Sequence, residues 1–176
     1  SPSATPAETI DQRLVSLLNF RTKLHYLESI LLSEDINRMI VFCRTKDRAD
    51  QVHRYLERKI EGGVKVIHSN KGQNTRINAF NAFRAGELRV LVATDVGARG
   101  IDVAAVSHVV NFDVPRTVED YTHRIGRTGR ADLSGIAITL VDRAEMYYVK
   151  KIEERLGHDI ERTPFDPPAE PLEYLP

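Results

Sequence analysis

The densest group of cationic side chains in the sequence lies between His123 and Arg130, in the run His-Arg-Ile-Gly-Arg-Thr-Gly-Arg. Glycine permits tight backbone turns, so Gly126 and Gly129 would let Arg127 and Arg130 point from one loop toward one target. Their guanidinium forks match the oxygens of a phosphoryl group. The run therefore indicates a phosphate-facing loop. The alternative is a solvated arginine-rich loop, as found in flexible nucleic-acid-binding tails.

A second polar segment follows the apolar run that begins at Val90. Parallel α/β folds bind ligands where loops leave the carboxyl ends of strands. Thr94 and the following backbone amides could bind one phosphate and Arg99 another, while Asp102 could accept hydrogen bonds from a sugar hydroxyl. The alternative is that Asp95 caps a helical turn and Asp102 pairs with an arginine.

The third polar segment runs from His68 to Arg76 and leads from a predicted strand into a predicted helix. Gln73 and Arg76 share one face of the first helical turn, where backbone amides favour an anion. By themselves, these two residues are better explained as a solvated helical turn. His68 fits equally well as a histidine that is hydrogen-bonded at the end of a strand.

The elements that must position these segments alternate between strands and helices. Apolar runs predict strands at 38–43, 64–67, 88–93, 106–112 and 135–141, with an extended stretch at 10–18. Helical spacing predicts helices at 21–32, 73–85 and 144–156, a helix capped by Thr45, and a short helix opened by Thr117. Ile77, Phe80 and Phe83 are expected on one helix face. Apolar strands between amphipathic helices predict a parallel sheet of at least five strands, with helices on both faces.

Composition limits the kinds of function open to the chain. Its 176 residues include 25 Lys and Arg and 25 Asp and Glu, so the net charge is zero. Because the chain as a whole would not attract an anion, any anion-binding site must be a local cluster of cations. The single cysteine, Cys43, lies in an apolar run and is expected to be a buried reduced thiol, as in a reducing intracellular compartment. The N-terminal residues show no secretion-signal pattern, and no apolar run is long enough to span a bilayer. The histidines and the cysteine do not have the spacing of a zinc site, so no structural metal is expected.

The two ends differ in composition from the middle of the chain. Residues 1–8 are expected to form a flexible linker or cut end, residues 9–162 a single domain, and the proline-rich residues 163–176 an extended tail.

Taken in order, the three polar segments, the run 39–46 and the intervening Asn111-Phe112-Asp113-Val114-Pro115 resemble the second RecA-like domain of DEAD-box RNA helicases. The resemblance spans roughly residues 8–157. It implies an α/β, RecA-like three-layer sandwich with a mainly parallel central sheet. Ser69 and Asn70 depart from the family pattern, in which Gly-Asp is common.

The resemblance also implies roles for individual residues. Arg127 and Arg130 would be arginine fingers that reach the γ-phosphate of ATP, while Asp102 and Gly100 would belong to the same ATP site. His123 and Arg124 would couple that site to RNA. The sugar-phosphate backbone of RNA would be held by five residues: Thr45, Gln73, Arg76, Thr94 and Arg99.

Motifs that grip ATP do not occur in these residues: there is no Gly-x-x-x-x-Gly-Lys-Ser/Thr loop, no Asp-Glu-Ala-Asp run and no Ser-Ala-Thr element. The resemblance therefore implies a fragment of a helicase, with ATP and Mg²⁺ held mainly by an N-terminal RecA-like domain of the same protein. We expect no ATPase activity without that domain, a monomeric isolated domain, a cytoplasmic location and no membrane partner. The RNA partner would be single-stranded or duplex.

Two other functions fit some of the same residues. A stand-alone RNA-binding module would keep the RNA face without catalysis, although Arg127 and Arg130 would then lack a purpose. A RecQ-type DNA helicase shares the Arg-x-Gly-Arg ending, but the Tyr121-Thr122-His123 lead-in favours the RNA branch.

Overall fold

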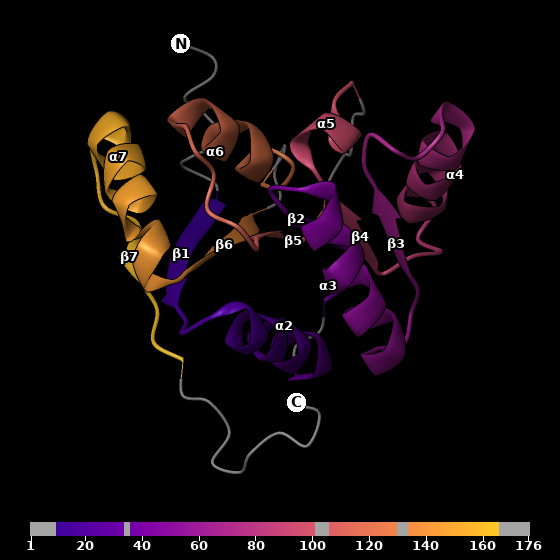
Figure 1. The fold of residues 1–176 in the computed structure, drawn as a ribbon, viewed down its shortest axis with the longest axis horizontal. Coiled ribbons are helices and arrows are strands. Elements are labelled where there is room, and N and C mark those ends of the chain that lie inside the picture. Colours follow the sequence, from indigo (N-terminus) through magenta and orange to yellow (C-terminus); the bar gives the residue numbers. More distant parts are fainter. Residues whose placement is uncertain (1–9, 34–35, 101–105, 130–133, 166–176) are drawn as a thin grey trace.

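A computed structural model describes residues 10–33, 36–100, 106–129 and 134–165. Within these residues, seven strands alternate with helices (Figure 1). The strands are β1 (Ile10–Ser16), β2 (Met39–Phe42), β3 (Val64–Ile67), β4 (Val90–Ala93), β5 (His108–Asn111), β6 (Gly135–Val141) and β7 (Glu161–Arg162). The helices are α2 (Phe20–Ser33), α3 (Lys46–Lys59), α4 (Gln73–Arg84), α5 (Asp95–Ala98), α6 (Val118–Ile125), the 3-10 turn η2 (Arg143–Glu145) and α7 (Met146–Leu156).

All seven strands form one sheet in the order β3-β4-β2-β5-β6-β1-β7. Each pairing between neighbouring strands is parallel, which confirms and extends the prediction of a mainly parallel sheet. Because parallel strands point the same way, the loops that follow them meet at one edge. Two of the polar segments, after β3 and after β4, begin at that edge. The third, from His123, begins in α6, the helix that follows β5.

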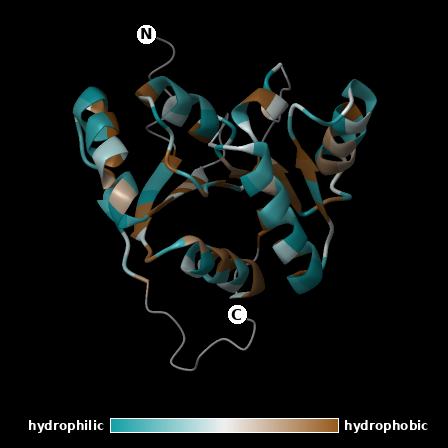
Figure 2. Ribbon diagram, viewed as in Figure 1, coloured by the Kyte–Doolittle hydropathy of each residue, from teal (hydrophilic) through white to brown (hydrophobic). Residues whose placement is uncertain are grey.

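Helices cover both faces of the sheet, as predicted (Figure 1). On one face α2 and α3 pack against side chains such as Val41, Val92 and Leu140. On the other face α4 packs against β3 and β4, whereas α6 and α7 pack against β1 and β6. Figure 2 shows hydrophobic strands β3 and β4 beside a largely hydrophilic α3. The fold is thus the predicted three-layer sandwich.

Helix α3 shows how a very polar sequence is held in place. Thr45 is its N-cap, as predicted, and the Thr45 Oγ1 accepts a hydrogen bond from the Arg48 N–H at 3.1 Å. Only Ala49, Val52 and Leu56 of this helix are buried, and all three are fully inaccessible. These three residues form a narrow apolar stripe, and the charged side chains of the helix lie outside it, toward solvent.

Some features differ from the predictions. Ile77 is 42% exposed, because α4 turns Ala79, Phe80 and Phe83 toward the sheet instead. Strand β5 is shorter than the predicted 106–112 run. Strand β7, which was not predicted, adds to the edge of the sheet beside β1.

The start of the predicted tail is also packed against the domain. The Phe165 ring meets the Tyr26 ring edge-on at 4.9 Å between centroids. Cys43 is buried and free, as predicted, and burial raises the pKa of its thiol well above the usual value. Among the described residues no helix is long and apolar enough to cross a membrane.

Candidate functional site

Arg76 lies in the first turn of α4, where it joins two of the three polar segments. Its Nε and Nη2 atoms donate to the Gly97 carbonyl oxygen at 3.3 and 3.0 Å. Its Nη1 atom lies 3.5 Å from the Oε1 atom of Gln73, which is exposed. Arg76 is therefore anchored to the loop after β4, with its guanidinium next to an exposed amide at a helix N-terminus.

Thr94 directly follows β4 and is the N-cap of α5. Its Oγ1 accepts a hydrogen bond from the Gly97 N–H at 3.0 Å, and the residue is buried. The alternative in which Asp95 caps this turn is therefore wrong, because the preceding threonine already occupies the cap. Arg99, the C-cap of α5, is exposed, and Gly100 follows it with a φ of 77°.

Gly97 fixes how close α5 lies to the neighbouring strand. A Cβ atom on Gly97 would lie 2.4 Å from the Ile67 carbonyl oxygen and 2.7 Å from the His68 Cα atom. Only glycine fits this approach. Gly97 also donates its N–H to the Thr94 hydroxyl and accepts from Arg76 through its carbonyl oxygen, so this residue links the segment after β4 to α4.

His68 stabilises the loop after β3. The Asn70 N–H donates to His68 Nδ1 at 3.2 Å, so the ring hydrogen is on Nε2, which lies 2.9 Å from Asp50 Oδ1. His68 is thus the hydrogen-bonded histidine at a strand end that was the alternative interpretation of this residue. Asn70, one of the departures from the family pattern, takes part in this arrangement.

Arg124 lies inside the site and is only 3% exposed. Its Nε and Nη2 atoms donate to the two carboxylate oxygens of Asp95 at 2.9 and 2.8 Å. Its Nη1 atom donates to Asn111 Oδ1 at 3.3 Å and to the Asp113 carbonyl oxygen at 2.9 Å. The guanidinium also lies over the Phe42 ring. One arginine therefore joins α6 to the ends of β2, β4 and β5.

The turn after α6 carries Arg127, which is half-buried. Thr128 is buried, and its hydroxyl donates to the Val106 carbonyl oxygen. Gly135, at the start of β6, packs so closely that a Cβ there would lie 2.5 Å from the Gly129 nitrogen. These contacts fix the backbone from which Arg127 extends. His123, one helical turn before it, is exposed.

The described structure brings together most of the residues predicted for the site. Thr45, Gln73, Arg76, Thr94 and Arg99 all lie at or just beyond the carboxyl ends of β2, β3 and β4. Asp102 and Arg130 lie outside the described residues. The sequence reasoning missed Asp95 as the partner of Arg124, since 29 residues separate the two and nothing in the local pattern pairs them.

Sequence comparison supplies the family. The helicase conserved C-terminal domain family matches residues 22–132. The chain belongs to this family, in its DEAD-box group. It is 43% identical over 141 residues to the ATP-dependent RNA helicase DBP8 of Gibberella zeae, which covers 79% of this chain and 26% of that protein. DEAD-box ATP-dependent RNA helicase 40 of Oryza sativa subsp. japonica is 40% identical over 153 residues, or 86% of this chain and 19% of that protein.

Solved structures agree with this assignment. The Escherichia coli DEAD-box protein SrmB, bound to regulator of ribonuclease activity A, superposes with a TM-score of 0.83 at 33% identity, covering 92% of this chain and 98% of that one. The C-terminal domain of the DEAD-box protein Dbp5 gives a TM-score of 0.82 at 31% identity, covering 90% and 92%. The domain is therefore a DEAD-box C-terminal domain with the RecA-like fold, rather than a RecQ-type domain. It spans about a fifth to a quarter of the curated relatives named above.

Proposed function

We propose that this chain supplies one half of an ATP-dependent RNA helicase, with an N-terminal RecA-like domain of the same protein as the other half. The observation that carries the proposal is the hydrogen-bonded framework centred on Gly97 and Arg124. Arg76, Thr94 and Asp95 belong to the polar segments next to the strands, whereas Arg124 opens the turn that carries Arg127. Hydrogen bonds to α5 therefore join the two sets of residues.

The RNA-binding part would be formed by Thr45, Gln73, Arg76, Thr94 and Arg99. They combine hydroxyl groups, an amide, guanidinium groups and helix N-termini at one edge of the sheet. Such groups bind sugar-phosphate oxygens and carry no base information. The domain would thus bind RNA with little preference for sequence.

The ATP-binding part would lie between the two domains. Arg127 and Arg130 would reach the γ-phosphate, and Gly100 and Asp102 would belong to the same ATP site. A cation placed at the transferring phosphoryl group offsets the charge that develops in the transition state, which is worth about 10³ to 10⁵ in rate. Mg²⁺ would be held with the ATP phosphates, mainly by the N-terminal domain. Within the described residues, no group of three or more His, Cys, Asp or Glu side chains is arranged to hold a metal ion.

Coupling between the two parts would pass through His123 and Arg124. Arg124 is held by Asp95, next to the residues proposed to bind RNA, and begins the turn that ends at Arg127, the residue proposed to reach ATP. Exposed His123 lies on the same helix and is available to the partner domain. Domain closure on RNA would then set the position of the fingers.

The proposal is tested by RNA-stimulated ATP hydrolysis, measured on this chain alone and on the protein that includes the N-terminal RecA-like domain. We expect no turnover from the chain alone and RNA-dependent turnover from the longer protein. RNA binding without turnover in the longer protein would instead support a non-catalytic RNA-binding module.

A further inference from the structure

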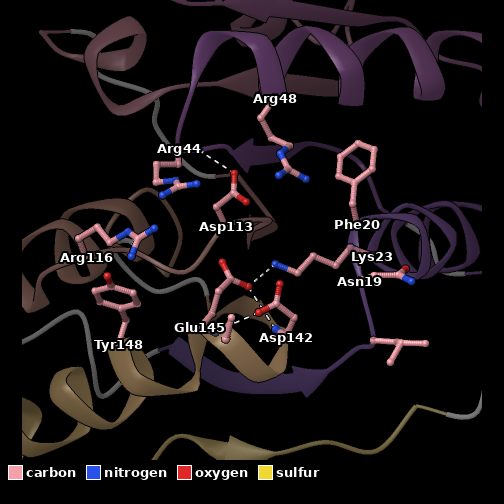
Figure 3. A pocket seen from close by; sticks show the side chains of 12 residues that line it. Asn19, Phe20, Lys23, Arg44, Arg48, Asp113, Arg116, Asp142, Glu145 and Tyr148 are labelled. Atoms are coloured by element: carbon pink, nitrogen blue, oxygen red, sulfur yellow. Dashed lines mark hydrogen bonds and ion pairs between the residues drawn. The ribbon is translucent and has the colours of Figure 1, made fainter.

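A pocket of about 460 Å³ opens beyond the ends of β1, β2, β5 and β6, and none of the roles described so far uses it (Figure 3). Its lining includes four cationic residues, Lys23, Arg44, Arg48 and Arg116, and three acidic ones. The lining thus holds one more cationic than acidic residue, and three of the four cations are arginines, which suit an anion.

The acidic side chains of the pocket are already bound by the protein. The Asp113 carboxylate accepts a hydrogen bond from the Arg44 N–H at 2.8 Å, and Asp142 caps the Glu145 N–H at 2.9 Å. Glu145 binds the buried Lys23 ammonium at 2.5 Å and also accepts from the Val114 N–H at 3.0 Å. Lys23 is therefore paired with Glu145, and each of the three carboxylates accepts a hydrogen bond from within the protein.

The three arginines differ from these groups. Within the described part of the chain, no carboxylate lies within ion-pair distance of the guanidinium of Arg44, Arg48 or Arg116. The Arg48 guanidinium lies over the Phe20 ring at 4.4 Å, and that of Arg116 lies over the Tyr148 ring at 3.9 Å. Stacking orients the guanidinium plane and leaves the N–H edge free to donate. Figure 3 shows the three guanidinium groups around the pocket.

The pocket adjoins the residues proposed to bind RNA. Arg44 directly precedes Thr45, and the Arg48 N–H donates to the Thr45 hydroxyl. A strand whose backbone lies at Thr45 would therefore pass next to two residues that line the pocket, Arg44 and Arg48. Phosphate oxygens are also among the groups that guanidinium forks bind through two parallel hydrogen bonds.

We propose that one or two phosphates of the same RNA strand bind in this pocket, held by Arg44, Arg48 and Arg116. The proposal rests on the proposed function, because it extends the RNA path from the residues assigned above. It implies that the domain binds a longer single strand than those residues alone would contact.

The test uses arginine side-chain N–H signals in nuclear magnetic resonance spectra of the ¹⁵N-labelled chain. Oligouridylates of about four and about ten nucleotides, within the range of site sizes for single-strand binding, would be titrated at low salt. We expect the signals of Arg44, Arg48 and Arg116 to shift with the longer strand only, whereas that of Arg76 shifts with both.

Paired variants measure the effect on affinity. The double variant Arg48→Gln/Arg116→Gln should weaken binding of the longer strand about tenfold, the effect of removing charge-assisted hydrogen bonds, and leave the shorter strand unchanged. The slope of its salt dependence should fall by about 0.7 for each phosphate that the variant no longer binds. The matched control, Arg54→Gln/Arg58→Gln, removes two exposed charges from α3, the helix that carries Arg48.

Several outcomes would overturn the proposal. Equal decreases in affinity for the pocket and control variants would show general charge attraction. Shifts of the three arginine signals with hexaglutamate but not with RNA would make the pocket a surface for an acidic protein. If Arg76 responds and the pocket does not, only this inference fails; if neither responds to RNA, the proposed function fails as well.

Discussion

Arg124 and Asp95 form a two-pronged ion pair, with Nε···Oδ1 at 2.9 Å and Nη2···Oδ2 at 2.8 Å. The arginine comes from α6 and the aspartate from α5, which follow strands that are not neighbours in the sheet. The Arg124 side chain is 3% exposed and that of Asp95 is 35% exposed. The pair thus links two functional segments at the border between core and solvent.

Asp95→Asn should destabilise the domain. The change leaves a buried guanidinium without its counter-ion, which costs about 3 to 5 kcal/mol for fully buried pairs. Because Asp95 is partly exposed, we expect the free energy of unfolding, measured with urea, to fall by about 2 kcal/mol. Glu87→Gln removes an exposed acidic charge that forms no ion pair among the described residues, and it should change stability by less than about 0.5 kcal/mol. If Asp95→Asn lowers the free energy of unfolding no more than Glu87→Gln does, the ion pair adds nothing to stability.

Gly97→Ser should lower the stability of the domain, although serine is a small side chain. The new Cβ would clash with the backbone at Ile67, so the loops after β3 and β4 must separate, at a cost of about 1 to 3 kcal/mol. The control is Gly72→Ser, because a Cβ there meets nothing within 4 Å and serine is a good N-cap for α4. Equal stability of the two variants in thermal unfolding would contradict the close packing at Gly97.

Arg76→Ala should weaken binding of single-stranded RNA and reduce its salt dependence by about 0.7 in the log–log slope, as expected when one phosphate is no longer bound. A purely structural role, through the hydrogen bonds to Gly97, would lower stability without changing that slope. Fluorescence anisotropy across a salt series separates the two. Arg54→Ala on exposed α3 is the charge-matched control, and an unchanged slope in Arg76→Ala relative to it would remove Arg76 from the RNA site.

Glu153 should give the domain a pH-dependent stability. Burial alone would raise its pKa, but hydrogen bonds from Arg162 and from the Ile160 N–H, together with nearby positive charge, lower the pKa below its usual value. A carboxyl group with a lowered folded-state pKa stabilises the fold above its unfolded pKa of about 4.3 and loses that contribution as the pH falls through the folded value. The stability difference between the unaltered chain and Glu153→Gln should therefore shrink as the pH is lowered from about 6 to about 3.

The neighbouring residue provides the comparison for this experiment. Glu154 is exposed, so Glu154→Gln should show no comparable pH-dependent difference. If Glu153→Gln and Glu154→Gln give parallel stability curves, the contact between α7 and β7 does not depend on the ionised carboxylate.

Patterns within a few residues were enough to predict much of the fold. Apolar runs identified the central strands, and Thr45 was correctly predicted to cap α3 because a cap depends only on the next helical turn. Strand β7 was missed because its two residues, Glu161 and Arg162, are charged and carry no apolar pattern. Ile77 was placed on the wrong face because helical spacing alone left it next to the buried stripe of α4.

The site was predicted in its parts but not in its connections. Polar segments after apolar strands indicated Thr94 and Arg76, yet the contact of Arg76 with Gly97 depends on β3 lying next to β4 in the sheet. The Arg124–Asp95 pair also depends on the strand order, with β2 lying between β4 and β5. The pocket arginines resemble ordinary surface charges in the sequence, because only the fold shows that no carboxylate of the described residues neutralises Arg48 or Arg116.

The most direct test of the proposed function is ATP turnover by the two-domain protein with Arg127→Ala. If Arg127 is an arginine finger, its removal should lower RNA-stimulated turnover by about 10³ or more while single-stranded RNA binding stays within about twofold of the unaltered protein. Arg155→Ala, which removes an exposed arginine from the last turn of α7, is the control and should leave both unchanged. Turnover of Arg127→Ala equal to that of the control would contradict the arginine-finger role and with it the catalytic part of the proposed function.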